Sequence, residues 1–274
     1  MKKQHTGWLG KVYLALVLVI LYLPIFYLVY YSFSSGKTME KFGHFSLVHY
    51  RVLATDTRMI QIVINTAIIA LLSSLIATVI GTLGALVIKR VRSRQQRQVL
   101  LSLNNVLMVS PDVLIGASFL IFFTVIGLRL GFVSVLLSHI AFSIPIVVLM
   151  VLPKLNEMSP TLADAAADLG ATPWQSLSRV TLPAMTPGIL VGYFMAFTYS
   201  LDDFAVTFFV TGNGFTTLSV EIYSRARQGI NLEINALSTV VFLLSLALVA
   251  GYYFLSSRAG RRNRVMTVKE GDVQ

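Results

Sequence analysis

Residues 164–183 read DAAADLGATPWQSLSRVTLP, a polar and alanine-rich stretch between two strongly apolar parts of the chain. Ser159-Pro160 precedes it and predicts a helix start, because serine is a good N-cap and proline suits the first helical turn. Thr172-Pro173 predicts a second start, at which Gln175 can close a capping box. Gly170 lies between the two, where a residue in the left-handed conformation would end the first helix. The stretch therefore predicts two short helices joined by a glycine corner.

The second of these helices ends at Leu182-Pro183. The first carries mostly small side chains. Four of its residues are alanines: Ala163, Ala165, Ala166 and Ala167. A helix with so little apolar bulk buries little surface and makes a poor core by itself. Its narrow profile would, however, let it enter a cleft on another protein. We therefore expect residues 159–183 to dock onto a partner.

The composition is typical of a protein with several membrane spans. Of the 274 residues, 55% are hydrophobic and 12% are charged, with a mean hydropathy of +0.75. The sequence has no Walker-type nucleotide-binding loop, so we expect any ATP to be bound by another chain. The absence of cysteine excludes disulfides and thiolate chemistry. The formal charge of +10 does not indicate nucleic-acid binding, because the basic residues cluster beside apolar runs as topology signals do.

Six apolar runs predict an all-α bundle of six transmembrane helices. They cover residues 12–33, 62–88, 103–126, 132–152, 188–210 and 236–255. Of the 22 Lys and Arg residues, 15 fall on one side of this arrangement, and the positive-inside rule makes that side cytoplasmic. Both termini and residues 159–183 are therefore expected inside the cell. The loops at 34–58 and 211–235 are expected outside, the second with a short helix near 220–228.

Three aspartates, Asp112, Asp202 and Asp203, fall within predicted spans. A charged aspartate at the bilayer centre costs about 2.5–3.5 kcal/mol, so each should face the bundle interior or a water-filled path. At 1.5 Å per residue, Asp112 lies roughly 15 Å into the third span and the pair roughly 22 Å into the fifth, nearer the outer side. Adjacent helical residues diverge by about 100°, so one of the pair would face the path and the other a neighbour.

A cationic substrate would supply the charge that these acids lack, because the predicted spans contain no lysine or arginine to neutralise them. The acids would then act as successive stations for an amine. The alternative is structural. Asp112 would cap a helix that is broken at Pro111, and Asp202-Asp203 would satisfy backbone groups near the outer end of the fifth span.

The segment at 159–183 resembles the EAA motif of ABC importer permeases. The matching positions are Asp164-Ala165-Ala166, Gly170, Val180 and Leu182-Pro183, with aspartate in place of the usual glutamate and valine in place of isoleucine. The resemblance implies a type I (MetI-like) permease fold of six helices. It also implies that Asp164, Ala165, Ala166, Gly170, Leu182 and Pro183 belong to a cytoplasmic coupling helix that docks into an ATPase.

Nearly the whole chain is similar to the second permease subunit of spermidine/putrescine importers. The similarity is carried by Ser110-Pro111-Asp112, Leu201-Asp202-Asp203, Phe209-Val210-Thr211-Gly212 and Glu233-Ile234-Asn235-Ala236-Leu237. It implies a permease, not an enzyme by itself, that pairs with a second permease, an ATPase dimer holding ATP and Mg, and an external polyamine-binding protein. The implied substrate path contains Asp112 and Asp203 first, then Asp202, with Tyr199 and Phe204 as aromatic candidates.

The resemblance also implies a division of the chain and a mechanism. Residues 1–61 would form an N-terminal helix and external loop, residues 62–256 the importer core, and residues 257–274 a basic cytoplasmic tail. The protein would lie in the cell membrane and work by alternating access, in which ATP binding to the ATPases moves the coupling helix and opens the spans to the outside.

Other functions fit the sequence less well. An ABC permease for ferric iron or sulfate would share the coupling motif, but the three aspartates favour a cation. A secondary transporter would need paired inverted halves, and no convincing repeat is present. A membrane aspartyl protease would need Asp112 and Asp203 at one depth and a Gly-x-Gly-Asp site, and this sequence has no such site. We expect no metal site, because His44, His49 and His139 are too scattered.

Overall fold

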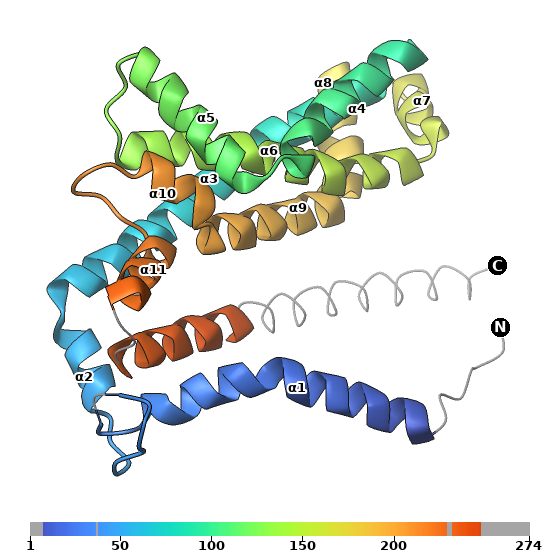
Figure 1. Cartoon of the computed structure of the whole chain (residues 1–274). Helices are drawn as coiled ribbons and strands as arrows, with labels where there is room; N and C mark the ends of the chain where they lie inside the picture. Colours follow the sequence, from blue (N-terminus) through green and yellow to red (C-terminus); the bar gives the residue numbers. More distant parts are fainter. Residues whose placement is uncertain (1–7, 37, 229–231, 248–274) are drawn as a thin grey trace. The chain divides into compact units, whose positions relative to one another are not determined.

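The structure is a computed structural model that describes residues 8–36, 38–228 and 232–247, and it forms helices joined by loops (Figure 1). An isolated antiparallel bridge joins Ser34 and Phe45. The chain divides into two compact units. One unit is residues 58–221, which we call the core unit, and the other combines residues 1–57 and 222–274. The prediction of an all-α protein is confirmed for the described residues.

The core unit contains most of the helices. In chain order they are α3 (Thr57–Arg90), α4 (Arg94–Val109), α5 (Asp112–Val125), α6 (Phe132–Glu157), α7 (Pro160–Asp168), α8 (Pro173–Ser176), α9 (Leu182–Asp202), α10 (Ala205–Val210) and the start of α11 (Leu218–Gln228). A π-helical turn, Leu177–Thr181, joins α8 to α9.

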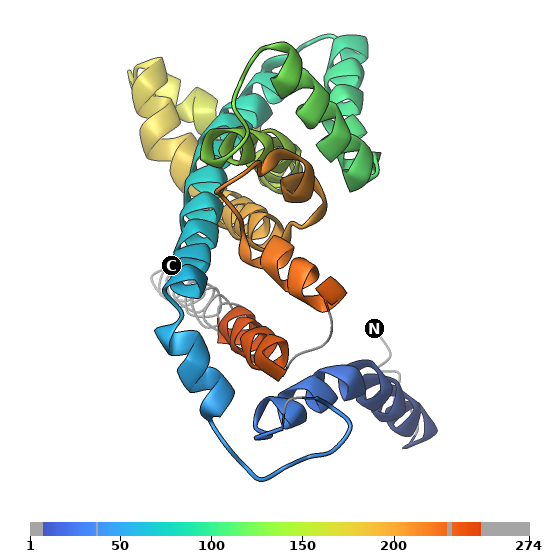
Figure 2. The same cartoon turned by 60° about the vertical axis from the view of Figure 1, so that its left-hand side comes forward.

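Two apolar clusters hold the core unit together. The first lies between α3, α6 and α9 and contains Ala85, Ile88, Val147, Val148, Val151, Leu152, Leu155, Met185 and Ala196. The second joins α3, α5, α6 and α10 through Ile69, Ile115, Phe123, Val135, Phe142, Val206 and Val210. In lipid such contacts stabilise helix association by van der Waals packing rather than by exclusion of water. Helices α7 and α10 lie at opposite ends of the packed pair α6 and α9 (Figures 1 and 2).

Glycine allows α3 to approach α6 closely. A Cβ atom at Gly81 would lie 2.7 Å from Val147 Cβ and 3.1 Å from the Ile144 carbonyl oxygen, which is too close for any side chain. Gly84 is less constrained, because a Cβ there would lie 3.5 Å from Val148 Cγ2. The close approach of the two helices therefore depends on Gly81 more than on Gly84.

Four helices are long and apolar enough to cross a membrane: Trp8–Ser32, Thr57–Arg90, Phe132–Glu157 and Pro173–Asp202. The pair α4 and α5 forms a fifth candidate, a broken span with a bend of 100° between its halves. The predicted sixth span falls partly on the apolar helix 232–247 and continues outside the described residues. The expected count of six is therefore approximate.

The helices extend beyond several of the predicted spans, as the third and fourth spans show. The third was expected to begin at residue 103, but α4 begins at Arg94, where Ser93 accepts a hydrogen bond from the Gln96 amide at 3.5 Å. This cap lets the basic connection become the first turn of a helix. The fourth was expected to end at residue 152, but α6 continues to Glu157 because Leu152 and Leu155 are buried in the first cluster.

The other unit contains α1 (Trp8–Ser32), α2 (Val48–Thr55) and the helix 232–247. The Ser32 and Tyr50 hydroxyls lie 2.7 Å apart and link α1 to α2. Arg225, near the end of α11, lies 3.6 Å from the Asp56 carboxylate and 3.5 Å from that of Glu233. The short helix expected near 220–228 is confirmed as α11.

Candidate functional site

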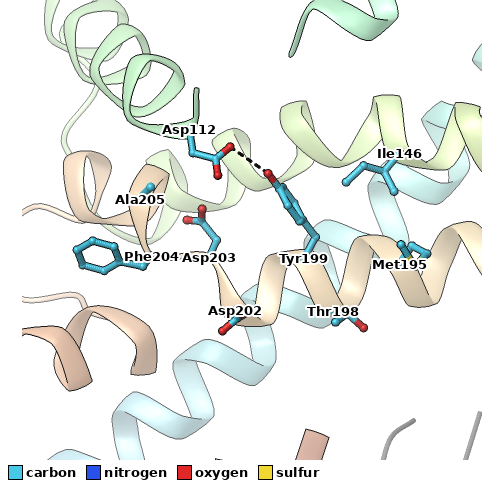
Figure 3. Close-up of a pocket in the computed structure, with 9 residues that line it drawn as sticks. All are labelled: Asp112, Ile146, Met195, Thr198, Tyr199, Asp202, Asp203, Phe204 and Ala205. Carbon is cyan, nitrogen blue, oxygen red and sulfur yellow. Dashed lines mark hydrogen bonds between the residues drawn. The ribbon is translucent and has the colours of Figure 1, made fainter. Parts of the chain in front are cut away.

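A pocket of about 380 Å³ lies where α5, α6, α9 and α10 meet (Figure 3). Its lining consists of Asp112, Ile146, Met195, Thr198, Tyr199, Asp202, Asp203, Phe204 and Ala205. All five side chains predicted for a substrate path are among these nine. The sequence placed Asp112 and the aspartate pair at separate depths, as successive stations. The structure instead gathers them around one pocket, because α4 and α5 form a broken pair and α5 packs on α10.

Asp112 is the first residue of α5 and lies directly after the break at Ser110-Pro111. Proline cannot continue the amide hydrogen bonds of α4, and the Pro111 carbonyl starts the next helix by accepting from the Leu114 and Ile115 amides. Asp112 is exposed, and its Oδ1 accepts a hydrogen bond of 3.0 Å from the Tyr199 hydroxyl. This is its single hydrogen bond among the described residues, so Oδ2 is open to a ligand.

Tyr199 reaches Asp112 from α9. Its ring contacts Phe142 of α6 edge to face, with 5.1 Å between centroids, and 41% of the residue is exposed. The contact with Phe142 fixes the ring while the hydroxyl is free to reach across to α5. Tyr199 therefore presents both a polar group and an aromatic surface to the pocket.

The predicted fifth span, residues 188–210, is not one continuous helix, because the chain leaves the helix at Asp203. Helix α9 ends at Asp202, residues 203–204 are not helical, and α10 starts at Ala205. The Asp203 carboxylate accepts from the Val206 amide at 3.3 Å and from the Thr207 amide at 2.8 Å. The carboxylate thus satisfies the first amides of α10, and this competes with continuation of the helix.

The helix break also settles which aspartate of the pair faces Asp112. Figure 3 shows Asp203 directed toward Asp112, whereas Asp202 points to the opposite side of α9. Asp202 is exposed, but the Asp203 side chain is only 5% exposed. The expected 100° divergence assumed that both residues are helical, and Asp203 is extended with φ −62° and ψ 122°. Phe204 also points away from Asp112 and packs near Phe208, with 5.5 Å between ring centroids.

His139 is a residue of this region that the sequence analysis dismissed. It is fully buried on α6, and its Nε2 lies 2.8 Å from Thr207 Oγ1 and 3.6 Å from Asp203 Oδ2. Its Nδ1 lies 2.7 Å from Ser200 Oγ. The sequence did contain a signal for a role of His139, because an imidazole buried within a span needs a polar partner to offset the cost of its burial. The sequence pattern could not identify that partner, because the partner lies some 60 residues away.

The charged side chains that line the pocket are all acidic. The described lining includes three carboxylates and neither lysine nor arginine. The apolar part of the lining includes Ile146, Met195 and the Tyr199 ring, together with Phe204 and Ala205. Such a site can bind a cation with a short hydrocarbon chain, by charge-assisted hydrogen bonds at the acids and by apolar contact between them.

Residues 159–183, which we call the coupling segment after the role that the resemblance implies, contain the predicted glycine corner. Helix α7 runs from Pro160 to Asp168 with Ser159 as its N-cap, although the Ser159 hydroxyl pairs with Thr161 at 2.6 Å rather than with a backbone amide. Gly170 has φ +80°, and its amide donates to the Ala167 carbonyl at 2.8 Å. The Ala171 amide donates to the Ala166 carbonyl at 3.0 Å, which completes a Schellman motif.

The second helix start is also confirmed, but its end is not where the sequence placed it. Thr172 and Gln175 form the capping box, with distances of 2.8 and 3.3 Å. The chain was expected to leave the helix at Leu182-Pro183. It continues instead through the π-helical turn into α9, so that Leu182 and Pro183 begin α9. Pro183 has no amide hydrogen to donate, and the wider turn just before it accommodates this loss.

The surface of the coupling segment is apolar at its corner. Leu169 is 89% exposed and Trp174 is 71% exposed. Asp164 and Ala165 are exposed as well, and Ala166 is partly buried. Large apolar side chains at such exposure form a patch that suits a protein partner.

Comparison with known proteins identifies the family. Residues 77–264 match the family of binding-protein-dependent transport system inner membrane components. The spermidine/putrescine transport system permease protein PotC of Haemophilus influenzae is 35% identical over 256 residues, which cover 93% of this chain and 98% of that protein. The putrescine transport system permease protein PotI of Escherichia coli strain K12 is 33% identical over 259 residues, 92% of each chain.

Solved structures show the fold. A chain from a bacterial ABC transporter involved in the import of the acidic polysaccharide alginate superposes with a TM-score of 0.70 at 21% identity, covering 92% of this chain and 96% of that one. A chain of the MetNI methionine ABC transporter in an inward-facing conformation gives a TM-score of 0.61 at 18% identity, covering 74% and 99%. The chain therefore belongs to the inner membrane components of binding-protein-dependent transport systems and has the fold of a type I ABC importer permease.

Proposed function

We propose that the protein is a permease subunit of an ATP-driven ABC importer and that it takes up polyamines such as spermidine and putrescine. The observation that carries this proposal is the pocket between α5 and α10, where three carboxylates and an aromatic ring occur without a basic lining residue. The names of the relatives support the same substrate class. A pocket of this charge is unfavourable for an anion such as sulfate.

Asp112 and Asp203 would bind the amino groups. A primary ammonium has three N–H donors, and each carboxylate keeps an oxygen that can accept from it. Oδ2 of Asp112 makes no hydrogen bond among the described residues, and Oδ1 of Asp203 accepts only the 3.3 Å bond from the Val206 amide. The Tyr199 ring adds a cation–π surface. The methylene chain between two amines would lie against Ile146 and Met195.

Residues 159–183 would couple the pocket to ATP hydrolysis. The exposed corner with Leu169 and Trp174 would dock onto an ATPase dimer, which would bind ATP and Mg. The π-helical turn continues into α9, so a movement of the corner would be transmitted along α9 to Tyr199 at the pocket. Alternating access would follow if ATP binding opened the pocket to the outside and hydrolysis reset it.

The remaining partners would be a second, homologous permease and an external polyamine-binding protein. The permease itself would not be an enzyme. We place it in the cell membrane, with both termini and residues 159–183 in the cytoplasm, on the basis of the distribution of Lys and Arg.

The test of substrate class is uptake by the complete complex in proteoliposomes, with the binding protein outside and ATP inside. We expect saturable, ATP-dependent uptake of labelled spermidine that excess putrescine inhibits and excess sulfate or ferric citrate does not. An assembled complex that hydrolyses ATP without taking up either polyamine would contradict the polyamine proposal and leave the family assignment intact.

A further inference from the structure

We propose that His139 is a positioning residue for substrate passage, acting through Thr207 on the carboxylate of Asp203. This inference rests on the proposed function, because it assigns a task to a group behind the substrate pocket. His139 does not line the pocket itself. Its exposure is 0%, and it contacts the pocket acid from the buried side.

A chain of buried side chains from four helices leads to Asp203. The Ser73 hydroxyl on α3 lies 2.9 Å from Ser200 Oγ on α9, and Ser200 Oγ lies 2.7 Å from His139 Nδ1 on α6. His139 Nε2 lies 2.8 Å from Thr207 Oγ1 on α10. Thr207 Oγ1 donates to Asp203 Oδ2 at 2.7 Å. Ser73, Ser200 and Thr207 are all buried.

The direction of the last two hydrogen bonds follows from the number of hydrogens. A threonine hydroxyl has one hydrogen, and Thr207 uses it on Asp203. His139 Nε2 must therefore carry a hydrogen and donate it to Thr207. The Ser73 hydroxyl can donate its one hydrogen either to the Ala70 carbonyl at 3.4 Å or to Ser200 at 2.9 Å. The two links from His139 through Thr207 to Asp203 both point toward the carboxylate.

This arrangement leaves one carboxylate oxygen for the pocket. Oδ2 of Asp203 accepts from the Thr207 amide at 2.8 Å and from the Thr207 hydroxyl at 2.7 Å, with His139 Nε2 at 3.6 Å. Oδ1 accepts only the longer bond from Val206. Because Oδ2 is held from behind, the carboxylate cannot rotate, and Oδ1 is the atom presented to an amine. Hydrogen bonds to a charged group are the stronger kind, so this orientation is well defined.

Removing one member of a buried chain leaves its neighbour unsatisfied. His139→Leu should leave Thr207 Oγ1 without its donor and weaken the hydrogen bond that this hydroxyl makes to Asp203. Thr207→Val should cut the same link while it preserves shape and leaves His139 in place. Both changes are expected to loosen Oδ2 of Asp203, which keeps the bond from the amide of residue 207, without removing the charge of the carboxylate.

The experiment measures spermidine transported per ATP hydrolysed by the reconstituted complete complex. We expect His139→Leu and Thr207→Val each to lower this ratio by about tenfold. The double variant should resemble the more severe single variant, because the two residues act in series. His139→Gln should recover much of the ratio, because its amide can donate to Thr207. Assembly and binding-protein-stimulated ATP hydrolysis should stay within about twofold of wild type.

The matched control is Ser138→Ala. Ser138 is equally buried on the same helix, but within the described part of the chain its hydroxyl bonds only to the Ser134 carbonyl, at 2.9 Å. If His139→Leu and Thr207→Val transport as well per ATP as Ser138→Ala, or if His139→Gln is no better than His139→Leu, the positioning role is wrong. A wild-type complex that hydrolyses ATP but takes up no polyamine would instead overturn the proposed function, and this inference with it.

Discussion

The hydroxyl of Tyr199 is the atom that links α9 to the acid at the start of α5. Tyr199→Phe removes the 3.0 Å hydrogen bond to Asp112 but keeps the ring against Phe142. We expect spermidine uptake per ATP to fall by about three- to tenfold, as for the loss of one hydrogen bond to a charged group. Ser118→Ala is the control, because the Ser118 hydroxyl on α5 bonds to the Leu114 carbonyl at 2.7 Å and does not line the pocket. Equal uptake by the two variants would contradict a role for the hydroxyl.

For single residues, the sequence identified which side chains belong to the pocket better than it predicted how those side chains are arranged. Asp112, Asp202 and Asp203 could be singled out because charged side chains within spans are costly. Which member of the pair faces the pocket could not be predicted, since Leu201-Asp202-Asp203-Phe204 contains neither proline nor glycine to mark the helix break. His139 could not be paired with Asp203 either, because their approach depends on how α6 packs against α10.

At the scale of elements, the glycine corner can be tested separately from the pocket. Gly170 has φ +80° and nothing within 4 Å of a Cβ, so Gly170→Ala should cost only the conformational penalty of about 1–2 kcal/mol. Gly170→Pro is incompatible with a positive φ and also removes the amide that bonds to Ala167. We expect the alanine variant to assemble with the ATPase and the proline variant to lose assembly or the coupling of ATP hydrolysis to uptake.

The matched control is Gly127, in the turn after α5. Gly127 also has a positive φ, +72°, and a Cβ built on it would have nothing within 4 Å. Its amide donates to the Thr124 carbonyl at 3.1 Å. Gly127→Pro disturbs the backbone in the same way at a site outside the coupling segment. If it uncoupled ATP hydrolysis as strongly as Gly170→Pro, the corner would have no special part in coupling. Co-purification of the ATPase and the ratio of uptake to hydrolysis are the measurements.

The crossing of α3 and α6 gives a stability prediction. Gly81→Ala places a methyl group 2.7 Å from Val147 Cβ and 3.1 Å from the backbone oxygen of Ile144, which overpacking should penalise by about 1–3 kcal/mol. Gly84→Ala, one turn away, meets only Val148 at 3.5 Å and should be nearly neutral. Thermal unfolding of the solubilised protein should show a lower midpoint for Gly81→Ala alone. A similar midpoint for both variants would show that the close approach is not needed.

Local signals predicted the elements well where capping chemistry is explicit. Thr172 with Gln175 marked one helix start, and Gly170 marked a helix end. Pro111 marked a break, but the bend of 100° depends on how α5 packs on α10 and cannot be obtained from a proline alone. The π-helical turn before Pro183 was missed because a Leu-Pro pair signals a helix end as readily as an accommodated proline.

At the scale of the whole molecule, the proposed topology can be tested directly, because the chain contains no cysteine. Asp168→Cys lies in the coupling segment and Asn213→Cys in the loop after α10. The first should react with a membrane-impermeant maleimide only after permeabilisation, and the second in intact cells. Labelling of Asp168→Cys in intact cells would contradict a cytoplasmic coupling segment, and with it the docking of an ATPase there.

We propose that a polyamine passes through the acidic pocket and contacts Asp112 directly. The most direct measurement compares spermidine uptake by the reconstituted complex carrying Asp112→Asn with that carrying Asp202→Asn. Both changes remove one carboxylate charge near the pocket, but Asp202 points away from Asp112. We expect about a tenfold fall in uptake per ATP for Asp112→Asn and a clearly smaller fall for Asp202→Asn, with ATP hydrolysis retained in both. Wild-type uptake by the Asp112→Asn complex would contradict it.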